Sequence, residues 1–262
     1  MKIFSYCISF PDDADVLADA LNSMSPFCDR IFLLDGGFEG ALCHHPRFTD
    51  PLREWIETRR EYDYDPLEIY GALESYTWNE VPITIWEHPF RDPAHARNYI
   101  LDRMAQEPEQ PDWIYWHDAD EIASWELIRG IRPKLESLSD DVVGVYVKWL
   151  TLVQDEQHCV QHMSDWLAHP RIHRPLSAHF QGNWHEHMVI DRNKCVRWDV
   201  RVIHTRALYR NRLKIQRGHD SIARGQTPLW ADAKMVDIPN GVTWPKLFWP
   251  NGESKIPFEE TI

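Results

Sequence analysis

The chain has 262 residues and a formal net charge of −13, because 41 Asp and Glu outweigh 28 Lys and Arg. A charged fraction of 26% and an apolar fraction of 43% are ordinary for a folded domain and argue against wholesale disorder. The acidic balance argues against a broad electrostatic surface for nucleic acid or anionic membranes, although a local basic patch stays open. The length suits one large domain, or one domain with an appendage.

The compartment is also constrained by composition. No apolar run approaches the roughly 18–20 residues that a membrane-spanning helix needs. The N-terminal MKIFSYCISFP lacks the long apolar region of a signal peptide. The five cysteines are an odd number without CxxC spacing, which argues against a zinc ribbon or a disulfide framework. We therefore expect a cytoplasmic protein with no integral membrane segment.

The first 35 residues predict a strand, a helix and a second strand. Residues 2–10 (KIFSYCISF) have the composition of a strand, and Asp12 can cap a helix whose apolar residues recur at helical spacing. Residues 31–34 form a short, fully apolar strand. This spacing is typical of a right-handed parallel strand–helix–strand unit. The less regular residues 40–80 are interpreted as an insertion.

Strands and helices continue to alternate up to about residue 150. One helix is expected from its cap, Asp92, through about Ala105, and another after Ser124, which Pro133 should break or kink. Short strands and loops follow, and residues 213–262 show little periodicity. This pattern predicts an α/β fold. The remaining expected strands are residues 83–86, 113–116, 142–150, 171–174, 185–190 and 200–204.

The strongest functional motif is Asp118-Ala119-Asp120-Glu121, directly after the aromatic segment WIYW. In an open parallel sheet, ligands bind beyond the carboxyl ends of the strands, so these carboxylates should face the binding crevice. Carboxylates at this spacing can hold Mg²⁺ or Mn²⁺, which prefer oxygen ligands and keep positions open for phosphate oxygens. The alternative is a solvated acidic turn, since a bare DxD is common by chance.

Two further positions can contact a nucleotide. Asp35 ends an apolar strand and is followed by Gly36 and Gly37, which permit close approach of the backbone, although the segment can also be an ordinary turn. Arg97, within the segment ARN, lies in the first turns of a predicted helix and can reach a phosphate. An exposed salt bridge is the alternative for this arginine.

The second half of the chain adds a histidine motif and a basic segment. Glu186 lies in WHEH, which is not the zinc-protease motif HExxH because its histidines are two apart. It can be a general base or a surface residue. His204 ends a predicted strand and is followed by a basic segment that includes Arg206 and Arg210. Within an acidic chain this segment suits a diphosphate, and a solvated basic helix is the competing interpretation.

The order of these motifs resembles the GT-A glycosyltransferases that use nucleotide sugars, specifically those of the family 2 type. The resemblance implies a GT-A (Rossmann-like) α/β fold with a mixed, mostly parallel sheet flanked by helices. It places a catalytic domain at residues 1–215, with the insertion at about 40–80, and a C-terminal extension at residues 216–262 that acts as a lid or surface wrap. The matching segments are FLLDGG (32–37), AHARNYIL (94–101), IYWHDADE (114–121), RIHR (171–174), GNWHEH (182–187) and VIHT (202–205).

The resemblance also implies a role for individual residues. Asp35 would contact the nucleoside, Asp118 would lie by the ribose and the metal, and Asp120 would bind the Mn²⁺ or Mg²⁺ that bridges the diphosphate. His204 would complete the metal shell, and Glu186 would activate the acceptor hydroxyl. The basic residues that would meet the donor are Arg97, Arg206 and Arg210. The implied reaction is a single displacement with inversion at the sugar.

Two other classes of function stay open. One is a metal-dependent phosphohydrolase or nucleotidyltransferase that uses the same carboxylates, although the stretch FPDDAD lacks the Gly-rich loop with a lysine that a nucleotidyltransferase of this architecture would have. The other is a non-catalytic carbohydrate-binding protein, which the 13 Trp would suit. The acceptor of a transferase could be a saccharide, a lipid-linked saccharide, a protein or a modified nucleobase.

Overall fold

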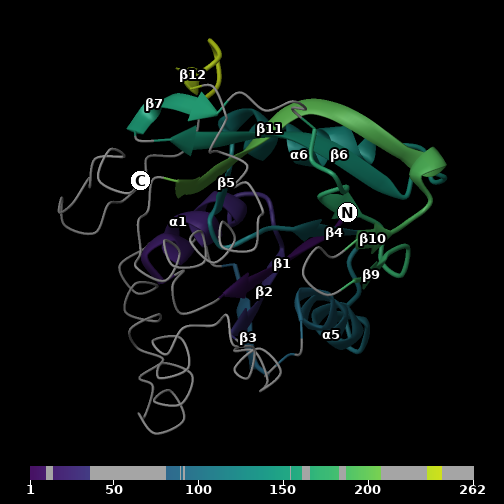
Figure 1. Cartoon of the computed structure of the whole chain (residues 1–262). Coiled ribbons are helices and arrows are strands. Elements are labelled where there is room, and N and C mark those ends of the chain that lie inside the picture. The colour runs from purple at the N-terminus through teal and green to yellow at the C-terminus, as the bar shows by residue number, and fades with distance from the viewer. Residues whose placement is uncertain are drawn as a thin grey trace, which may run out of the picture.

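The computed structural model of the chain is shown in Figure 1. The predicted insertion at 40–80, the general-base candidate Glu186 and the basic residue Arg210 lie outside the part that the structure describes. The division of the chain at residue 215 stays a prediction. The described residues are 1–9, 14–35, 81–88, 90, 92–153, 155–160, 166–182, 187–207 and 235–243.

The N-terminal half forms a parallel sheet. In space, the strands follow the order β3, β2, β1, β4, and each neighbouring pair is parallel. Helix α1 (Ala14–Met24) connects β1 to β2, as the sequence predicts, and α5 (Pro93–Ala105) connects β3 to β4. The strand bounds are Ile3–Ser9 for β1, Arg30–Asp35 for β2, Ile83–Glu87 for β3 and Trp113–Trp116 for β4.

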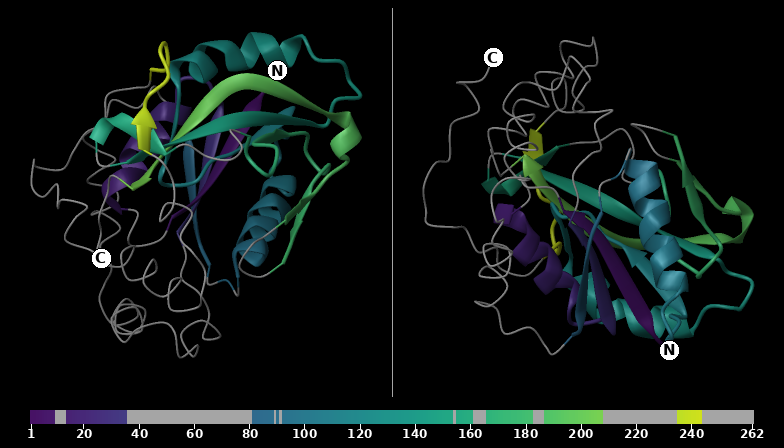
Figure 2. Two further views of the ribbon diagram at one scale, coloured as in Figure 1. Left: turned by 45° about the horizontal axis from the view of Figure 1, so that its top comes forward. Right: turned by 90° about the horizontal axis from the view of Figure 1, so that it is seen from below.

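The two faces of this sheet have separate cores because successive strand residues point to opposite sides. On β1, Ile3 and Cys7 join the core that α1 and α6 (Trp125–Glu136) cover, whereas Phe4 and Tyr6 join the core beneath α5. Figure 2 shows α1 and α5 on opposite sides of the strands. Both faces are therefore buried, as expected for a parallel sheet.

The C-terminal half extends the same sheet with mixed strand directions. The short strand β8 lies antiparallel between β4 and β6, while the long strand β11 runs parallel to β6 and antiparallel to β5. The bounds are Glu121–Ala123 for β5, Gly144–Val153 for β6, Asp155–Val160 for β7, Ile172–His173 for β8, Cys195–Ala207 for β11 and Met235–Asp237 for β12, with a 3₁₀ turn at Arg192–Lys194 before β11. Strand β12 pairs with β7 at the edge.

A separate two-stranded hairpin, β9 (His179–Gln181) with β10 (His187–Val189), packs on the α5 side. Its central residues, Phe180 and Met188, are buried in the core beneath α5. The hairpin and α5 therefore cover the same face of the sheet.

The predicted α/β class is confirmed, because the sheet is mixed and its N-terminal strands are parallel. The predicted break at Pro133 is absent, because α6 continues to Glu136. Because Pro133 lies in the last turn, it removes little more than one helical hydrogen bond. Among the described residues, none of the helices combines the length and apolar character needed to cross a bilayer.

Candidate functional site

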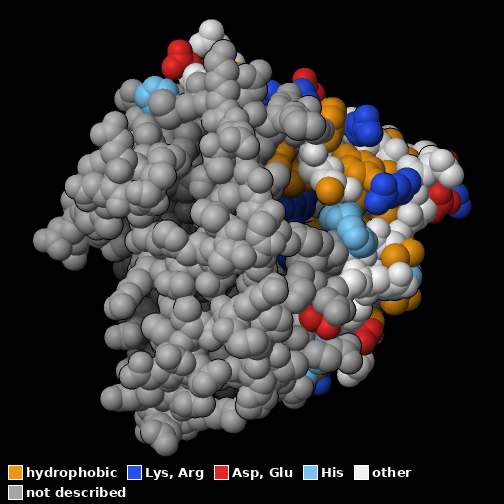
Figure 3. All heavy atoms as spheres, viewed as in Figure 1, with side chains coloured by type: hydrophobic (Ala, Val, Ile, Leu, Met, Phe, Trp, Pro, Cys, Tyr) orange, Lys and Arg blue, Asp and Glu red, His pale blue; other side chains and the backbone are white. Residues whose placement is uncertain are grey.

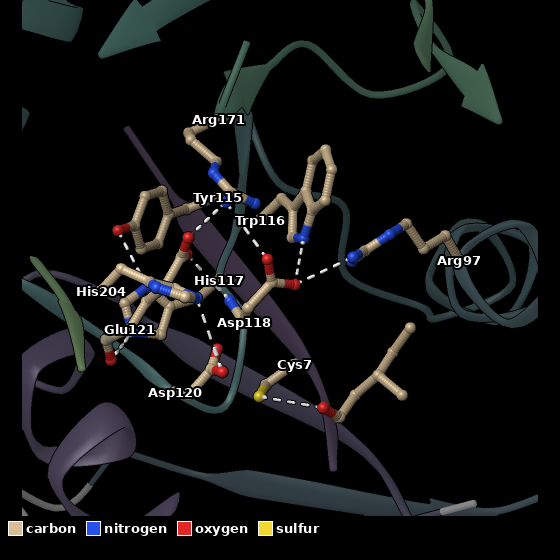
Figure 4. Close-up of polar contacts among 11 residues, drawn as sticks. Cys7, Arg97, Tyr115, Trp116, His117, Asp118, Asp120, Glu121, Arg171 and His204 are labelled. Atoms are coloured by element: carbon tan, nitrogen blue, oxygen red, sulfur yellow. Dashed lines mark hydrogen bonds and ion pairs between the residues drawn. The ribbon is translucent and has the colours of Figure 1, made fainter. Parts of the chain in front are cut away.

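The acidic motif lies where the sequence predicts it, at the carboxyl end of β4. All four residues of β4 are buried, and the chain turns directly after it through Asp118 and Asp120 into β5. The side chains become progressively exposed toward the turn: Glu121 is 1% exposed, Asp120 is 15% and Asp118 is 31%. The motif therefore contains one fully buried carboxylate and two that are partly exposed, and Figure 4 shows their polar contacts.

Three donors hold the carboxylate of Asp118. Nη2 of Arg97 and the indole Nε1 of Trp116 each donate to Oδ1 at 2.9 Å, and Nη2 of Arg171 donates to Oδ2 at 3.2 Å. The arginines come from α5 and from the residue before β8, so they reach Asp118 from different elements (Figure 4). Both carboxylate oxygens are thus fixed, which sets the orientation of this side chain.

Charge, more than solvent, determines the ionisation of Asp118. Burial acts to raise its pKa, but Arg97 and Arg171, with the hydrogen bonds from Arg97 and Trp116, outweigh that effect and hold the pKa of Asp118 well below its usual range. Asp118 is therefore ionised at neutral pH. A carboxylate offers about four acceptor positions, so the three donors leave capacity for one further contact.

Glu121 forms the buried side of the same cluster. Its Oε2 accepts a hydrogen bond from the backbone N of Asp118 at 3.1 Å, and its Oε1 forms an ion pair with Nη2 of Arg171. Burial acts to raise the pKa of Glu121, whereas the guanidinium of Arg171 lowers it and favours the ionised form. The guanidinium of Arg171 therefore contacts both the partly exposed carboxylate of Asp118 and the buried carboxylate of Glu121.

His117 is neutral and buried beneath the turn between β4 and β5. Burial lowers its pKa to about 4. Its Nε2 lies 2.7 Å from the carbonyl of Glu121, which can only accept, so Nε2 carries the proton and Nδ1 accepts from the hydroxyl of Tyr115 at 3.0 Å. These bonds fix the backbone between Asp118 and Glu121.

The structure brings His204 to Asp120, although the two are far apart in sequence. His204 lies on β11 opposite Glu121 of β5, and its Nε2 is 3.6 Å from Oδ2 of Asp120. The neighbouring Thr205 donates to the carbonyl of Asp120 from both its backbone N, at 2.8 Å, and its hydroxyl, at 2.9 Å. The late histidine and the acidic motif therefore share one site.

The chemistry of Asp120 and His204 suits a divalent cation, since carboxylate oxygen and imidazole nitrogen are both ligands for Mn²⁺. Within the described ranges, no three His, Cys, Asp or Glu side chains gather closely enough to form a metal site by themselves. Mg²⁺ in nucleotide enzymes is often bound by one or two carboxylates together with substrate phosphates. The metal role of Asp118, Asp120 and His204 stays a prediction.

Four other predicted residues cannot be placed in the site. Asp35 ends β2, where its backbone pairs with Ser9 and Glu87, but its side chain is not among those described. The backbone of Arg206 belongs to β11, again without a described side chain. Arg210 and Glu186 lie outside the described residues. Their roles stay predictions.

Two residues with large roles in the geometry received none from the sequence. Arg171 was noted only as part of RIHR, and Trp116 only as part of an aromatic strand. The guanidinium carbons of Arg97 and Arg171 lie 3.8 Å and 4.2 Å from the ring centroid of Trp116. Such cation–π contacts add to the hydrogen bond from its indole. Its position at the strand end just before the acidic motif was the available clue for Trp116, whereas no local pattern identifies Arg171.

An aromatic wall continues from Trp116 toward the surface. Phe180 packs edge-on against Trp116 with ring centroids 5.1 Å apart, and His169 stacks on Trp116 at 6.2 Å. His187, from the predicted WHEH motif, meets His169 at 5.9 Å. The hairpin that carries this motif therefore lies beside the acidic site.

The described surface is not uniformly acidic, in spite of the net charge of −13. On the face in Figure 3, Lys and Arg side chains lie beside hydrophobic ones, and the acidic side chains lie toward its edges.

Comparisons with known proteins add little to this geometry. No protein-family model and no curated protein sequence matches the chain. It is similar to the crystal structure of S. aureus TarS 1–349, with 10% identity, a TM-score of 0.44, and coverage of 79% of this chain but 61% of that one. It is also similar to a crystal structure of a mycobacterial protein, with 13% identity, a TM-score of 0.41 and coverage of 91% and 84%. The chain thus spans less than two thirds of the TarS fragment, and neither likeness assigns an activity or a substrate.

Proposed function

We propose that this chain is a metal-dependent glycosyltransferase that moves a sugar from a nucleoside-diphosphate sugar to an acceptor hydroxyl, with inversion at the anomeric carbon. The observation that carries the proposal is the meeting of Asp120 and His204, 3.6 Å apart, beside the two arginines that hold Asp118. A site for a nucleoside diphosphate needs both cation ligands and fixed positive charge, and this strand end provides both kinds of group.

Asp120 and His204 are the residues that would hold Mn²⁺ or Mg²⁺, with Asp118 beside them. When bound, the cation supplies positive charge against the leaving diphosphate. The free acceptor position of Asp118 suits either the cation or a ribose hydroxyl, because its carboxylate is ionised and 31% exposed. With only these few protein ligands, the cation would keep coordination positions open for phosphate oxygens.

The arginines have the complementary task of stabilising negative charge on the donor. Arg97 is 7% exposed and fixed by Asp118 and Trp116, so it needs little reorganisation when charge develops nearby. We propose that Arg206 and Arg210 contribute further positive charge and that Asp35 contacts the nucleoside. All three assignments rest on sequence position alone.

The acceptor hydroxyl needs a base, and Glu186 is our candidate. It belongs to the segment between β9 and β10, and the flanking His187 lies on the aromatic wall that reaches Trp116. The position of His187, the last residue of the motif, supports the proposal. The acceptor itself, whether saccharide, lipid-linked saccharide, protein or modified nucleobase, is left open.

Isothermal titration calorimetry with UDP, GDP, ADP and CDP, each with and without Mn²⁺, tests the proposal. We expect at least one nucleoside diphosphate to bind more tightly with Mn²⁺, and we call the ratio of the two dissociation constants the Mn²⁺ enhancement. Asp120→Asn should abolish this enhancement. The matched control is Asp140→Asn, since Asp140 is fully exposed and pairs with Arg174 rather than with a residue of the site. Equal enhancement in the Asp120 and Asp140 variants would contradict the metal assignment.

Product analysis separates the alternatives. Transfer of the sugar to an acceptor identifies a transferase, whereas release of free sugar or phosphate alone identifies a hydrolase. Binding of saccharides without any turnover of a nucleotide sugar would identify a carbohydrate-binding protein and overturn the proposal.

A further inference from the structure

Arg171 is the most constrained charged side chain in the described part of the site. Its backbone is fixed on both sides, because its N donates to the carbonyl of Val145 at 3.0 Å and its carbonyl accepts from the N of Trp116 at 2.7 Å. Its side chain is 6% exposed and lies over the ring of Trp116. Because β8 pairs with both β4 and β6, the guanidinium of Arg171 lies at the end of β4.

One nitrogen of this guanidinium makes both of its side-chain hydrogen bonds. Nη2 donates to Oδ2 of Asp118 and to Oε1 of Glu121. Nε and Nη1 are buried and have no hydrogen-bond partner among the described residues. Buried donors without partners are costly, so the position is not explained by the stability of the cluster alone. A buried ion pair is likewise weak evidence for a stabilising role.

We propose that Arg171 is a positioning residue of the donor site, which holds the Asp118 carboxylate in its ligand-binding orientation by anchoring it to the buried Glu121. This inference rests on the proposed function and adds to it a residue to which the sequence assigned no role. Arg97 and Trp116 both use Oδ1, so Arg171 supplies the hydrogen bond that holds Oδ2. Without it, the Asp118 carboxylate can rotate about the remaining contacts.

The geometry requires arginine specifically. A planar guanidinium can meet two carboxylates at once, whereas a lysine ammonium is a point charge on a flexible chain. Removing Arg171 alone would leave Glu121 buried without its cation, which is strongly destabilising. A fair test must therefore remove both charges together.

The test compares four proteins by calorimetry with the nucleoside diphosphate of the panel that binds best. The charge-balanced variant is Arg171→Met with Glu121→Gln, which retains an acceptor for the backbone N of Asp118. The conservative variant is Arg171→Lys. The control is Arg174→Met, because Arg174 lies over Trp113, donates from Nε to the carbonyl of Val142 at 3.4 Å and pairs with the exposed Asp140 at 3.9 Å. Wild type completes the set.

We expect the charge-balanced variant to unfold within a few degrees of wild type but to bind the nucleotide about 10- to 100-fold more weakly, as is typical when the partner that orients a ligand-binding group is lost. Arg171→Lys should give an intermediate loss. The Mn²⁺ enhancement should persist in both, because Asp120 and His204 are untouched, and this readout separates a positioning role from collapse of the site.

Wild-type affinity in the charge-balanced variant would overturn the inference while leaving the proposed function intact. If that variant does not fold, Arg171→Lys decides, since wild-type affinity there is equally incompatible with the positioning role. Absence of Mn²⁺-enhanced nucleotide binding in wild type would overturn the proposed function itself, and this inference with it.

Discussion

The side-chain amide of Asn98 exchanges two hydrogen bonds with the backbone of Phe180. The Phe180 N donates to Oδ1 at 2.8 Å, and Nδ2 donates to the Phe180 carbonyl at 2.8 Å. This pair of hydrogen bonds attaches the hairpin β9–β10 to α5. The residue before Asn98 on the same helix is Arg97, whose side chain contacts Asp118. Successive residues of α5 therefore fix the acidic site and the hairpin that carries the predicted base.

We expect Asn98→Ala to lower the free energy of unfolding by about 1–3 kcal/mol, because it leaves the backbone N and carbonyl of Phe180 without their partner. Urea denaturation measures this loss. Asn193→Ala is the control, since Asn193 is exposed and makes its hydrogen bond through the backbone. An equal effect in both alanine variants would contradict this interpretation.

His204→Ala should reduce the Mn²⁺ enhancement of nucleotide binding by at least about tenfold, because it removes the imidazole beside Asp120. Calorimetry with and without Mn²⁺ gives the ratio. His158→Ala serves as the control, because His158 is a partly exposed histidine of β7 whose Nε2 lies 3.8 Å from the exposed Asp237. If His204→Ala leaves the ratio at its wild-type value, the histidine does not belong to the metal shell.

Glu186→Gln should lower kcat of sugar transfer by at least about 100-fold with donor affinity nearly unchanged, because glutamine keeps the shape of the side chain but cannot accept the acceptor's proton. Transfer is measured by mass spectrometry of products from a set of saccharide, lipid-linked, peptide and nucleobase acceptors. Glu136→Gln, at the end of α6, is the control. Near wild-type transfer in Glu186→Gln would show that Glu186 is not the general base.

His173 should make stability depend on pH. It is fully buried on β8, where burial lowers its pKa to about 4, and its Nδ1 lies 3.0 Å from the carbonyl of Arg174. The unfolded chain takes up a proton below about pH 6.5, but the folded chain does so only near pH 4. The unfolded state thus binds more protons in this window, so stability is complete above about pH 6.5 and falls by about 3 kcal/mol toward pH 4.

His173→Asn tests this dependence, because the asparagine amide can still donate to the Arg174 carbonyl but does not titrate. Urea denaturation between pH 4.5 and 7.5 should give a shallower decline for this variant than for wild type. Part of the slope should remain, since burial also lowers the pKa of His117 to about 4. Identical slopes would show that His173 contributes nothing to the acid sensitivity.

Leu176 has a left-handed backbone, with φ of 60°, and its side chain is 89% exposed. This conformation costs an ordinary L-residue about 1–2 kcal/mol, whereas asparagine tolerates it. Because an exposed side chain loses little packing, Leu176→Asn should raise the free energy of unfolding by about 0.5–1 kcal/mol. Leu176→Val should lower it, since β-branched residues are still less tolerant there. Urea denaturation that ranks the two variants in the opposite order would contradict the assignment of strain.

Several features of this protein follow from sequence alone, because they depend on neighbouring residues. Asp92 caps α5 by accepting from the backbone N of His95 at 2.8 Å, and the proline after it occupies the first turn, as the local pattern predicts. The apolar segment Trp113–Trp116 became a buried strand with the acidic motif at its end. Local capping and alternation are short-range effects, so a window of a few residues contains the information.

Only the tertiary structure decided which distant side chains meet. Arg171 reaches Asp118 and Glu121 because β8 pairs between β4 and β6, and His204 reaches Asp120 because β11 pairs with β5. Asn98 meets Phe180 because α5 and the hairpin cover one face of the sheet. No residue near Arg171 or Phe180 in the chain encodes these contacts. They depend on strand order and register, which are set by burial of apolar residues across the whole domain.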